Sequence, residues 1–311
     1  AAKGPVFGLR AVGNPKLGYF VYELAPGAVQ HGAVIVTNVG TAAGTVKLYA
    51  SDGTTGPTTG TVYQTSQKPT GTGAWVSFAR SSFALAPGGH RSVPFTVRVP
   101  ANASPGQWVA GIVAETSEKV ASQKPGEKAH VQIRIRNLTI VAVQVNIPGK
   151  RVYAFRIGRV ATGGTHGFQK VLIRVANVGN VLAKPRGAVT IYDRSGRVVE
   201  TLPFGMDTFL PHTEIDYPGL LKTALPAGQY SASVRLVLPA QAGLAARTVT
   251  SRPSFTVSKS DVQQVFTSSS PTPAPPGGAG GSPSSGLPTW AYAAIAAGAL
   301  VVLLVLGWLL R

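Results

Sequence analysis

Apolar and polar residues alternate with a period of two along much of the first 258 residues. From residue 93 to residue 99, every odd position is Val or Phe, and the even positions are Pro, Thr and Arg. From residue 131 to residue 136, Val and Ile alternate with Gln and Arg. Such alternation is typical of a strand with one face on a core and the other in solvent. We therefore predict strands at both places, and residues 131–136 as a half-buried sandwich strand with its apolar face on the core and its basic face outward.

Turn signals separate the predicted strands at short intervals, and no segment shows the period of an amphipathic helix. Gly occurs 37 times and Pro 24 times, and pairs such as Pro26-Gly27, Asp52-Gly53 and Ser195-Gly196 lie between apolar runs. Many short strands joined by such turns are typical of antiparallel sandwiches. The predicted fold class is therefore all-β, built from Ig-like β-sandwiches.

An internal repeat predicts the number of sandwiches. The segment Val34–Gly40, with the sequence VIVTNVG, is echoed by Leu172–Gly179, with the sequence LIRVANVG. Each copy leads into a similar second strand. Two copies of one fold are therefore expected, with Pro148-Gly149 between them. We predict a first sandwich over residues 1–147 and a second over residues 148–258.

The C-terminal part of the chain has a different composition. Between Thr267 and Pro288, 6 Pro, 5 Gly and 6 Ser make up 17 of 22 residues, and none is charged. The segment Trp290–Leu310 has 21 residues without charge or Pro, which as a helix would span about 31 Å, the thickness of a bilayer core. We predict a disordered Pro/Gly/Ser-rich stalk over residues 259–288, and a single transmembrane helix with its tail over residues 289–311.

The first residues bear on the location of the protein. The chain starts with Ala1-Ala2-Lys3 and without Met, as expected after a signal peptidase has removed a signal peptide. We therefore expect a single-pass protein of the plasma membrane, with both sandwiches outside the cytoplasm. Because secreted eukaryotic receptors commonly carry disulfides, the absence of Cys favours a bacterial surface protein.

The charge of the chain indicates which partners it attracts. Lys and Arg number 29 and Asp and Glu number 11, so the formal net charge is +18. Anionic partners are therefore favoured. Because no recognition helix, zinc finger or RNA-binding aromatic motif accompanies the charge, we expect wall polymers or lipid headgroups rather than nucleic acid. The few carboxylates, the 5 His and the lack of a nucleophile motif predict a protein that is not an enzyme and holds no cofactor.

Two segments of the first domain resemble a known family. The first is Gly18–Gly27, with the sequence GYFVYELAPG, which runs into Val36-Thr37-Asn38. The second is Phe83–Gly89, followed by Val97–Pro100 and by Gly106–Ile112, with the sequence GQWVAGI. These segments resemble the WxL-interacting proteins of Gram-positive bacteria. The resemblance covers most of residues 6–145, whereas in the second domain it rests mainly on position.

The resemblance implies a domain layout and a function. The layout is a peptidoglycan-binding Ig-like domain, a second Ig-like domain of the host-protein-binding type and a C-terminal membrane helix. We therefore expect a membrane-anchored, non-catalytic surface protein that acts in adhesion. Its expected partners are peptidoglycan or anionic wall polymers, and another cell-surface or host protein.

Four residues are candidates for ligand binding. Trp75 and Trp108 carry flat apolar rings that can stack on sugars. Trp75 follows a Gly-rich loop and is the better candidate for an exposed binding aromatic, whereas Trp108 is expected to pack in the sandwich core rather than to bind. Arg134 and Arg136 lie on the basic face of their strand, where they either attract anionic polymers or are simply solvated.

Two alternative functions remain open from the sequence. A chaperone-like Ig module that assembles other surface proteins would carry a long exposed apolar edge strand. A metal-dependent enzyme would use His212, Glu214 and Asp216, which alternate as if on one strand face, although a solvated face explains the same pattern.

Overall fold

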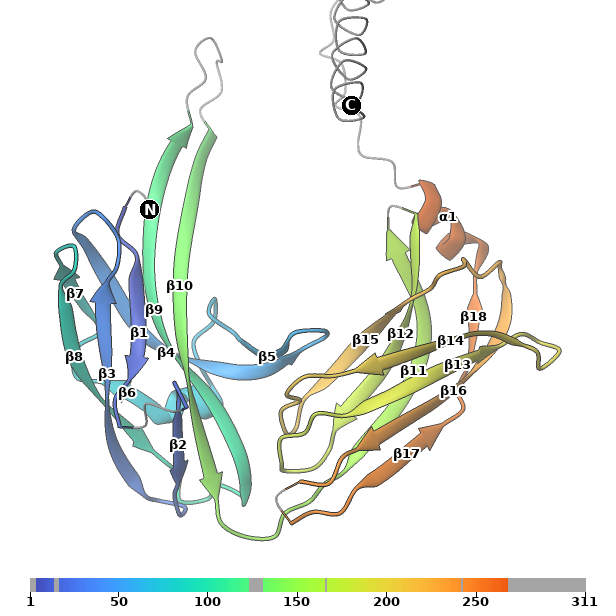
Figure 1. Ribbon diagram of the computed structural model, residues 1–311, viewed down its shortest axis with the longest axis horizontal. Helices are drawn as coiled ribbons and strands as arrows, with labels where there is room; N and C mark the ends of the chain where they lie inside the picture. Colours follow the sequence, from blue (N-terminus) through green and yellow to red (C-terminus); the bar gives the residue numbers. More distant parts are fainter. Residues whose placement is uncertain (1–3, 14–16, 123–130, 166, 242, 268–311) are drawn as a thin grey trace, which may run out of the picture. The chain divides into compact units, whose positions relative to one another are not determined.

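The computed structural model describes residues 4–13, 17–122, 131–165, 167–241 and 243–267 (Figure 1). These residues form strands with one short 3-10 helix, η1, and one α-helix, α1. The all-β prediction is confirmed.

The first sandwich consists of two sheets. One has the strand order β1-β3-β8-β6, and the other has the order β2-β10-β9-β4-β5, with β7 also paired to β4. All neighbours are antiparallel except β2 and β10, which are parallel. The elements are β1 (Phe7–Ala11), β2 (Phe20–Glu23), β3 (Val29–Asn38), β4 (Gly44–Gly56), β5 (Gly60–Tyr63), η1 (Thr72–Trp75), β6 (Val76–Phe78), β7 (Ser82–Leu85), β8 (His90–Arg98), β9 (Gly106–Ser122) and β10 (Val131–Ile147).

The second sandwich also consists of two sheets. One has the order β11-β12-β15, and the other has the order β14-β13-β16-β17, with β18 also paired to β16. The elements are β11 (Phe155–Thr165), β12 (Phe168–Asn177), β13 (Arg186–Tyr192), β14 (Val198–Gly205), β15 (Glu214–Leu220), β16 (Gly228–Leu238), β17 (Arg247–Ser251), β18 (Ser254–Val257) and α1 (Lys259–Thr267).

Each sandwich has its own hydrophobic core. In β8, Val93, Phe95 and Val97 are buried, as the alternation predicts, and they pack with Val34 and Val36 of β3. The second core is built in the same way from residues of the second sandwich alone. Both Ig-like sandwiches expected from the repeat are therefore present.

The repeated Asn-Val-Gly segment has the same role in both copies. Asn38 and Asn177 are each the last residue of a strand and are fully buried. The Asn38 amide donates to the carbonyls of Ala42 and Leu85, and its oxygen accepts from Gly40 N–H at 3.0 Å. This side chain therefore satisfies main-chain groups that leave the sheet at the turn.

One predicted face is not buried. Residues 131–136 do form a strand, but Ile135 is 44% exposed instead of packing in the core. The reason is length, because β9 and β10 have 17 residues each whereas β3 and β8 of the other sheet have 10 and 9. The β9–β10 hairpin therefore extends past the rest of the first sandwich (Figure 1), and Ile135 lies where the opposite sheet no longer covers it.

The predicted stalk begins too early. Residues 259–267, assigned to the stalk above, fold as α1, in which Val265 is buried and Val262 packs on the second core. The Ser258 hydroxyl accepts from Asp261 N–H at 3.0 Å, and the Asp261 carboxylate accepts from Ser258 N–H at 2.9 Å. This reciprocal pair is a capping box that starts the helix.

The remaining C-terminal predictions lie outside the described residues. They are the stalk over residues 268–288 and the transmembrane helix over residues 289–311. Within the described part of the chain, neither helix is long and apolar enough to span a bilayer. Residues 1–269 form one compact unit that contains both cores and α1, so a fragment that keeps them can end at residue 269.

Candidate ligand-binding hollow

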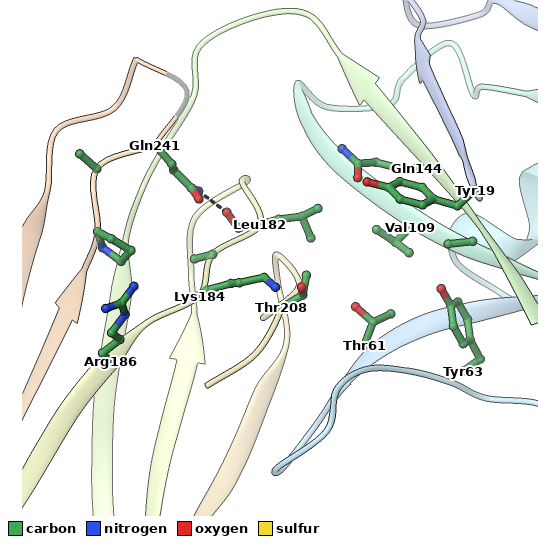
Figure 2. Close-up of a pocket in the computed structure, with 14 residues that line it drawn as sticks. Tyr19, Thr61, Tyr63, Val109, Gln144, Leu182, Lys184, Arg186, Thr208 and Gln241 are labelled. Atoms are coloured by element: carbon green, nitrogen blue, oxygen red, sulfur yellow. Dashed lines mark hydrogen bonds between the residues drawn. The ribbon is translucent and has the colours of Figure 1, made fainter. Parts of the chain in front are cut away.

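A hollow of about 720 Å³ lies between the first sandwich and the second. Figure 2 shows Tyr19, Tyr63 and Gln144 on one side and Lys184, Arg186 and Gln241 on the other. Its volume is in the range of sites that hold small ligands, roughly 300–1,000 Å³. The lining residues are Tyr19, Thr61, Tyr63, Val109, Ala142, Gln144, Leu182, Ala183, Lys184, Arg186, Thr208, Pro239, Ala240 and Gln241.

The first sandwich contributes the outer face of its larger sheet. Val141, Val143 and Val145 of β10 point into the core, so the alternate residues Ala142 and Gln144 point to the hollow. Tyr63 of β5 reaches this face because Gly111 of β9 has no side chain, and a Cβ there would lie 2.6 Å from the tyrosine ring.

Burial affects the chemistry of this wall. Desolvation raises the pKa of the Tyr63 hydroxyl to about 12, so the tyrosine stays neutral at physiological pH. Tyr63 therefore offers a ring face and a hydroxyl that both donates and accepts hydrogen bonds.

The second sandwich contributes the charged wall. Lys184 forms an ion pair with Asp207 at 2.7 Å, so its charge is balanced. Arg186 is exposed at the start of β13 and forms no ion pair within the described part of the chain. Gln241 donates its amide N–H to the Leu182 carbonyl. The unbalanced charge of the hollow is therefore the guanidinium of Arg186, which is suited to a carboxylate or phosphate.

Hydrogen bonds between the sandwiches frame the hollow. Leu182 N–H donates to the Gln107 side chain at 2.7 Å, and Gln107 N–H donates to the Asn180 carbonyl at 2.8 Å. The hydroxyls of Thr55 and Thr213 lie 2.6 Å apart. Of these residues Leu182 lines the hollow, so its bond to Gln107 ties that wall to the first sandwich.

The two candidate tryptophans lie together, and neither lines the hollow. The rings of Trp75 and Trp108 are 5.4 Å apart, and the Trp108 ring is 5.7 Å from the ring of His212 in the second sandwich. Both tryptophans are half-buried against the first core. The exposed position expected for Trp75 is therefore wrong, because η1 places its ring against Trp108.

Arg136 forms an ion pair with Glu115 within the first sandwich. Its Nε and Nη2 donate to the two oxygens of Glu115, both at 2.8 Å, and Glu115 also accepts from the Tyr49 hydroxyl at 2.7 Å. The bond from Arg136 lowers the pKa of Glu115 to about 2. Burial, followed by the hydrogen bond to Glu115, raises the pKa of Tyr49 to about 12. The Arg136 charge is therefore balanced, unlike that of Arg186.

Arg134 lies in the outer part of the β9–β10 hairpin, where its backbone faces that of Lys119 in β9. The lining residues are not apparent from the sequence, because they come from positions between 19 and 241 and no local motif marks them.

The residues proposed as metal ligands are separated by the structure. His212 is not in a strand but in the preceding turn, with a φ of 58°, and its ring lies against Trp108. Arg174 binds Asp216 at 2.9 Å and Glu214 at 3.5 Å. Among the described residues, no group of three His, Cys, Asp or Glu side chains is placed to hold a metal ion.

Comparisons with known proteins show a likeness of fold. No family model and no curated protein matches the chain. A chain of the chaperone–tip adhesin complex of CFA/I fimbriae is 13% identical, with 79% of this chain and 98% of that chain covered and a TM-score of 0.38. The E. coli chaperone DraB is 14% identical, with 81% and 98% covered and a TM-score of 0.34. Both similarities are distant, and they do not assign the chain to a family.

Proposed function

We propose that this chain is a non-catalytic bacterial surface protein that binds the cell wall, with the hollow as its ligand site. In this proposal it belongs to the WxL-interacting type and is anchored in the plasma membrane by residues 289–311, with both sandwiches outside the cytoplasm. The partners are peptidoglycan or anionic wall polymers and another cell-surface or host protein.

The observation that carries the proposal is the chemistry of the hollow. Tyr19 and Tyr63 offer ring faces of the kind that pack on sugars, and Gln144 offers an amide for hydrogen bonds. Arg186 adds an unbalanced charge for a carboxylate or a phosphate. Wall glycans combine sugar rings, amides and anionic groups. The hollow offers a matching partner for each of these groups in its tyrosines, its glutamine and its arginine.

Arg186→Gln is expected to weaken binding to the wall roughly tenfold or more, because a hydrogen bond to a charged group contributes about 1.5–3 kcal/mol. The fragment of residues 1–269 is incubated with purified peptidoglycan, with and without its anionic polymers, at low and high salt. The amount retained gives the affinity.

Arg194→Gln is the matched control. Arg194 is exposed in the turn after β13 and does not line the hollow, and this substitution removes the same charge. The site is supported if the parent fragment stays bound at high salt and if Arg186→Gln weakens this binding but Arg194→Gln does not. Equal losses in both variants would reduce the interaction to general electrostatics, and a parent fragment that is not retained in any condition would refute wall binding.

A second candidate function is protein assembly by strand addition, as in the chaperone-like alternative. Leu24 N–H donates to the Asn146 carbonyl, so the even-numbered main-chain groups of β10 point away from β9. β2 pairs only with residues 143–146, and no other described strand pairs with this edge. Ile135 and Leu138 beside it are 44% and 37% exposed. Such an edge is suited to an extended, apolar segment of another protein.

Leu138→Pro is expected to abolish strand addition, because Pro removes an outward N–H of β10 while the bonds to β9 use the neighbouring residues. Displayed ten-residue peptides are selected on the fragment 1–269, and their binding to the variants is measured. Leu138→Ala retains the N–H and should weaken binding only a few-fold. Selected peptides that bind Leu138→Pro as well as the parent would exclude this edge.

A further inference from the structure

The end of the second sandwich that carries α1 has an exposed apolar and basic surface. Phe168 at the start of β12 is 66% exposed, and Leu220 at the end of β15 is 58% exposed. Lys170 is opposite Leu220 in the β12–β15 pair, and the exposed Lys222 follows two residues later. We call Phe168, Lys170, Leu220 and Lys222 the Phe168 patch.

The apolar members of the patch point to the same side. In β12, Gln169 and Val171 are buried, so the alternate residues Phe168 and Lys170 lie on the outer face of the sheet. Residues that are opposite each other in an antiparallel pair share a face, so Leu220 lies on that face with Lys170. Two large apolar side chains and a lysine therefore face solvent together.

The patch lies where the chain leaves the described unit. Gly167, the residue before Phe168, donates its N–H to the Val265 carbonyl of α1 at 2.8 Å, and α1 ends at Thr267. Twenty-two residues separate Thr267 from Trp290, where the apolar segment Trp290–Leu310 begins. A flexible chain of that length spans about 25 Å. If residues 290–310 anchor the protein, this end of the second sandwich is the part tethered closest to the bilayer.

We propose that the Phe168 patch docks on the surface of an anionic lipid bilayer. Phe168 and Leu220 enter the boundary between headgroups and acyl chains, and Lys170 and Lys222 lie at the headgroups, as in proteins that bind membrane interfaces. The Glu200 carboxylate accepts from the main-chain N–H of Lys222 at 3.1 Å and places a negative charge beside the patch. Apolar insertion therefore contributes most of the affinity, and the charge favours anionic lipid.

This inference rests on the membrane anchor of the proposed function, and its test separates the two. The fragment of residues 1–269, which lacks the apolar segment, is sedimented with vesicles of phosphatidylglycerol and phosphatidylcholine and with vesicles of phosphatidylcholine alone. The parent should bind the anionic vesicles more strongly. Phe168→Ser and Leu220→Ser should each lower the partition coefficient roughly tenfold.

Val39→Ser is the control, since Val39 is also 66% exposed but belongs to the first sandwich. It should leave vesicle binding unchanged. If the Phe168→Ser fragment binds vesicles as well as the parent does, membrane docking by the patch is refuted, and the proposed binding to the cell wall is unaffected. Dimerisation of the parent that is lost in Phe168→Ser would show that the patch binds a second copy instead. Full-length protein that washes off membranes at high pH would refute the anchor itself.

Discussion

Replacing Asn177 with alanine is expected to lower the free energy of unfolding by about 3 kcal/mol. The Asn177 side chain is fully buried, and its amide donates to the carbonyls of Val181 at 2.9 Å and Phe209 at 3.4 Å. Its oxygen accepts from Gly179 N–H at 3.1 Å. Alanine leaves these main-chain groups without their partner in a place that water does not reach, and each unsatisfied buried group costs about 1–3 kcal/mol.

Urea unfolding of the fragment 1–269 measures this loss, and Val178→Ala is the control. Val178 is the next residue but is exposed, so its truncation should change stability by less than about 0.5 kcal/mol. A loss of less than about 1 kcal/mol in Asn177→Ala would show that the turn does not depend on this side chain. Asn38→Ala should give a similar loss in the first sandwich, because Asn38 makes the same kind of bonds.

The sequence is sufficient to predict the two sandwiches, for a reason that Asn38 and Asn177 illustrate. An alternating strand that ends in Asn-Val-Gly contains both the buried face and the residue that closes the turn, all within a few positions. Information of this kind is local, so it is visible without a structure. The same locality explains why the strand around Val93 to Val97 was predicted correctly.

Local sequence patterns do not predict that the β9–β10 hairpin extends past the rest of the first sandwich. The alternation around Ile135 indicates which face is apolar, but it does not indicate how far the opposite sheet extends. The helix α1 was missed because its 9 residues are too few to establish a helical period, and because it directly precedes a Pro/Gly/Ser-rich tract. Its only local signal is the cap formed by Ser258 and Asp261.

The hollow is the least predictable feature, because its walls belong to different sandwiches. Tyr63 and Arg186 are more than a hundred residues apart, and neither belongs to a motif. Trp75, Trp108, Arg134 and Arg136 are candidates because of their residue type and their local pattern in the sequence. Residue type does not reveal that Glu115 balances Arg136, or that Trp108 contacts His212.

Replacing Trp108 with alanine is expected to destabilise the protein and to uncouple the unfolding of the two sandwiches. Trp108 has a ring neighbour in each sandwich, Trp75 in the first and His212 in the second, and its indole N–H donates to the Ser104 carbonyl at 3.1 Å. Full truncation of a buried aromatic costs about 3–5 kcal/mol, and because Trp108 is half-buried we expect about 2–3 kcal/mol. Part of this loss should come from the contact between the sandwiches.

Differential scanning calorimetry shows whether the two sandwiches unfold together or separately. The parent fragment should unfold in a single transition if the contact between the sandwiches couples them, and Trp108→Ala should unfold in two. Trp75→Ala is the comparison, because Trp75 contacts Trp108 from within the first sandwich, so its loss should destabilise that sandwich while the ring contact between Trp108 and His212 remains.

A double-mutant cycle isolates the contact between Trp108 and His212. His212 has a φ of 58°, a conformation that Asn tolerates, so His212→Asn removes the ring without adding strain to the backbone. The two substitutions should be coupled by about 0.5–1.5 kcal/mol, the range measured for aromatic pairs. Additive losses would show that the rings are adjacent without stabilising each other. The hydrogen bonds of Gln107 and Thr55 would then carry the coupling, and Trp108→Ala would leave a single transition.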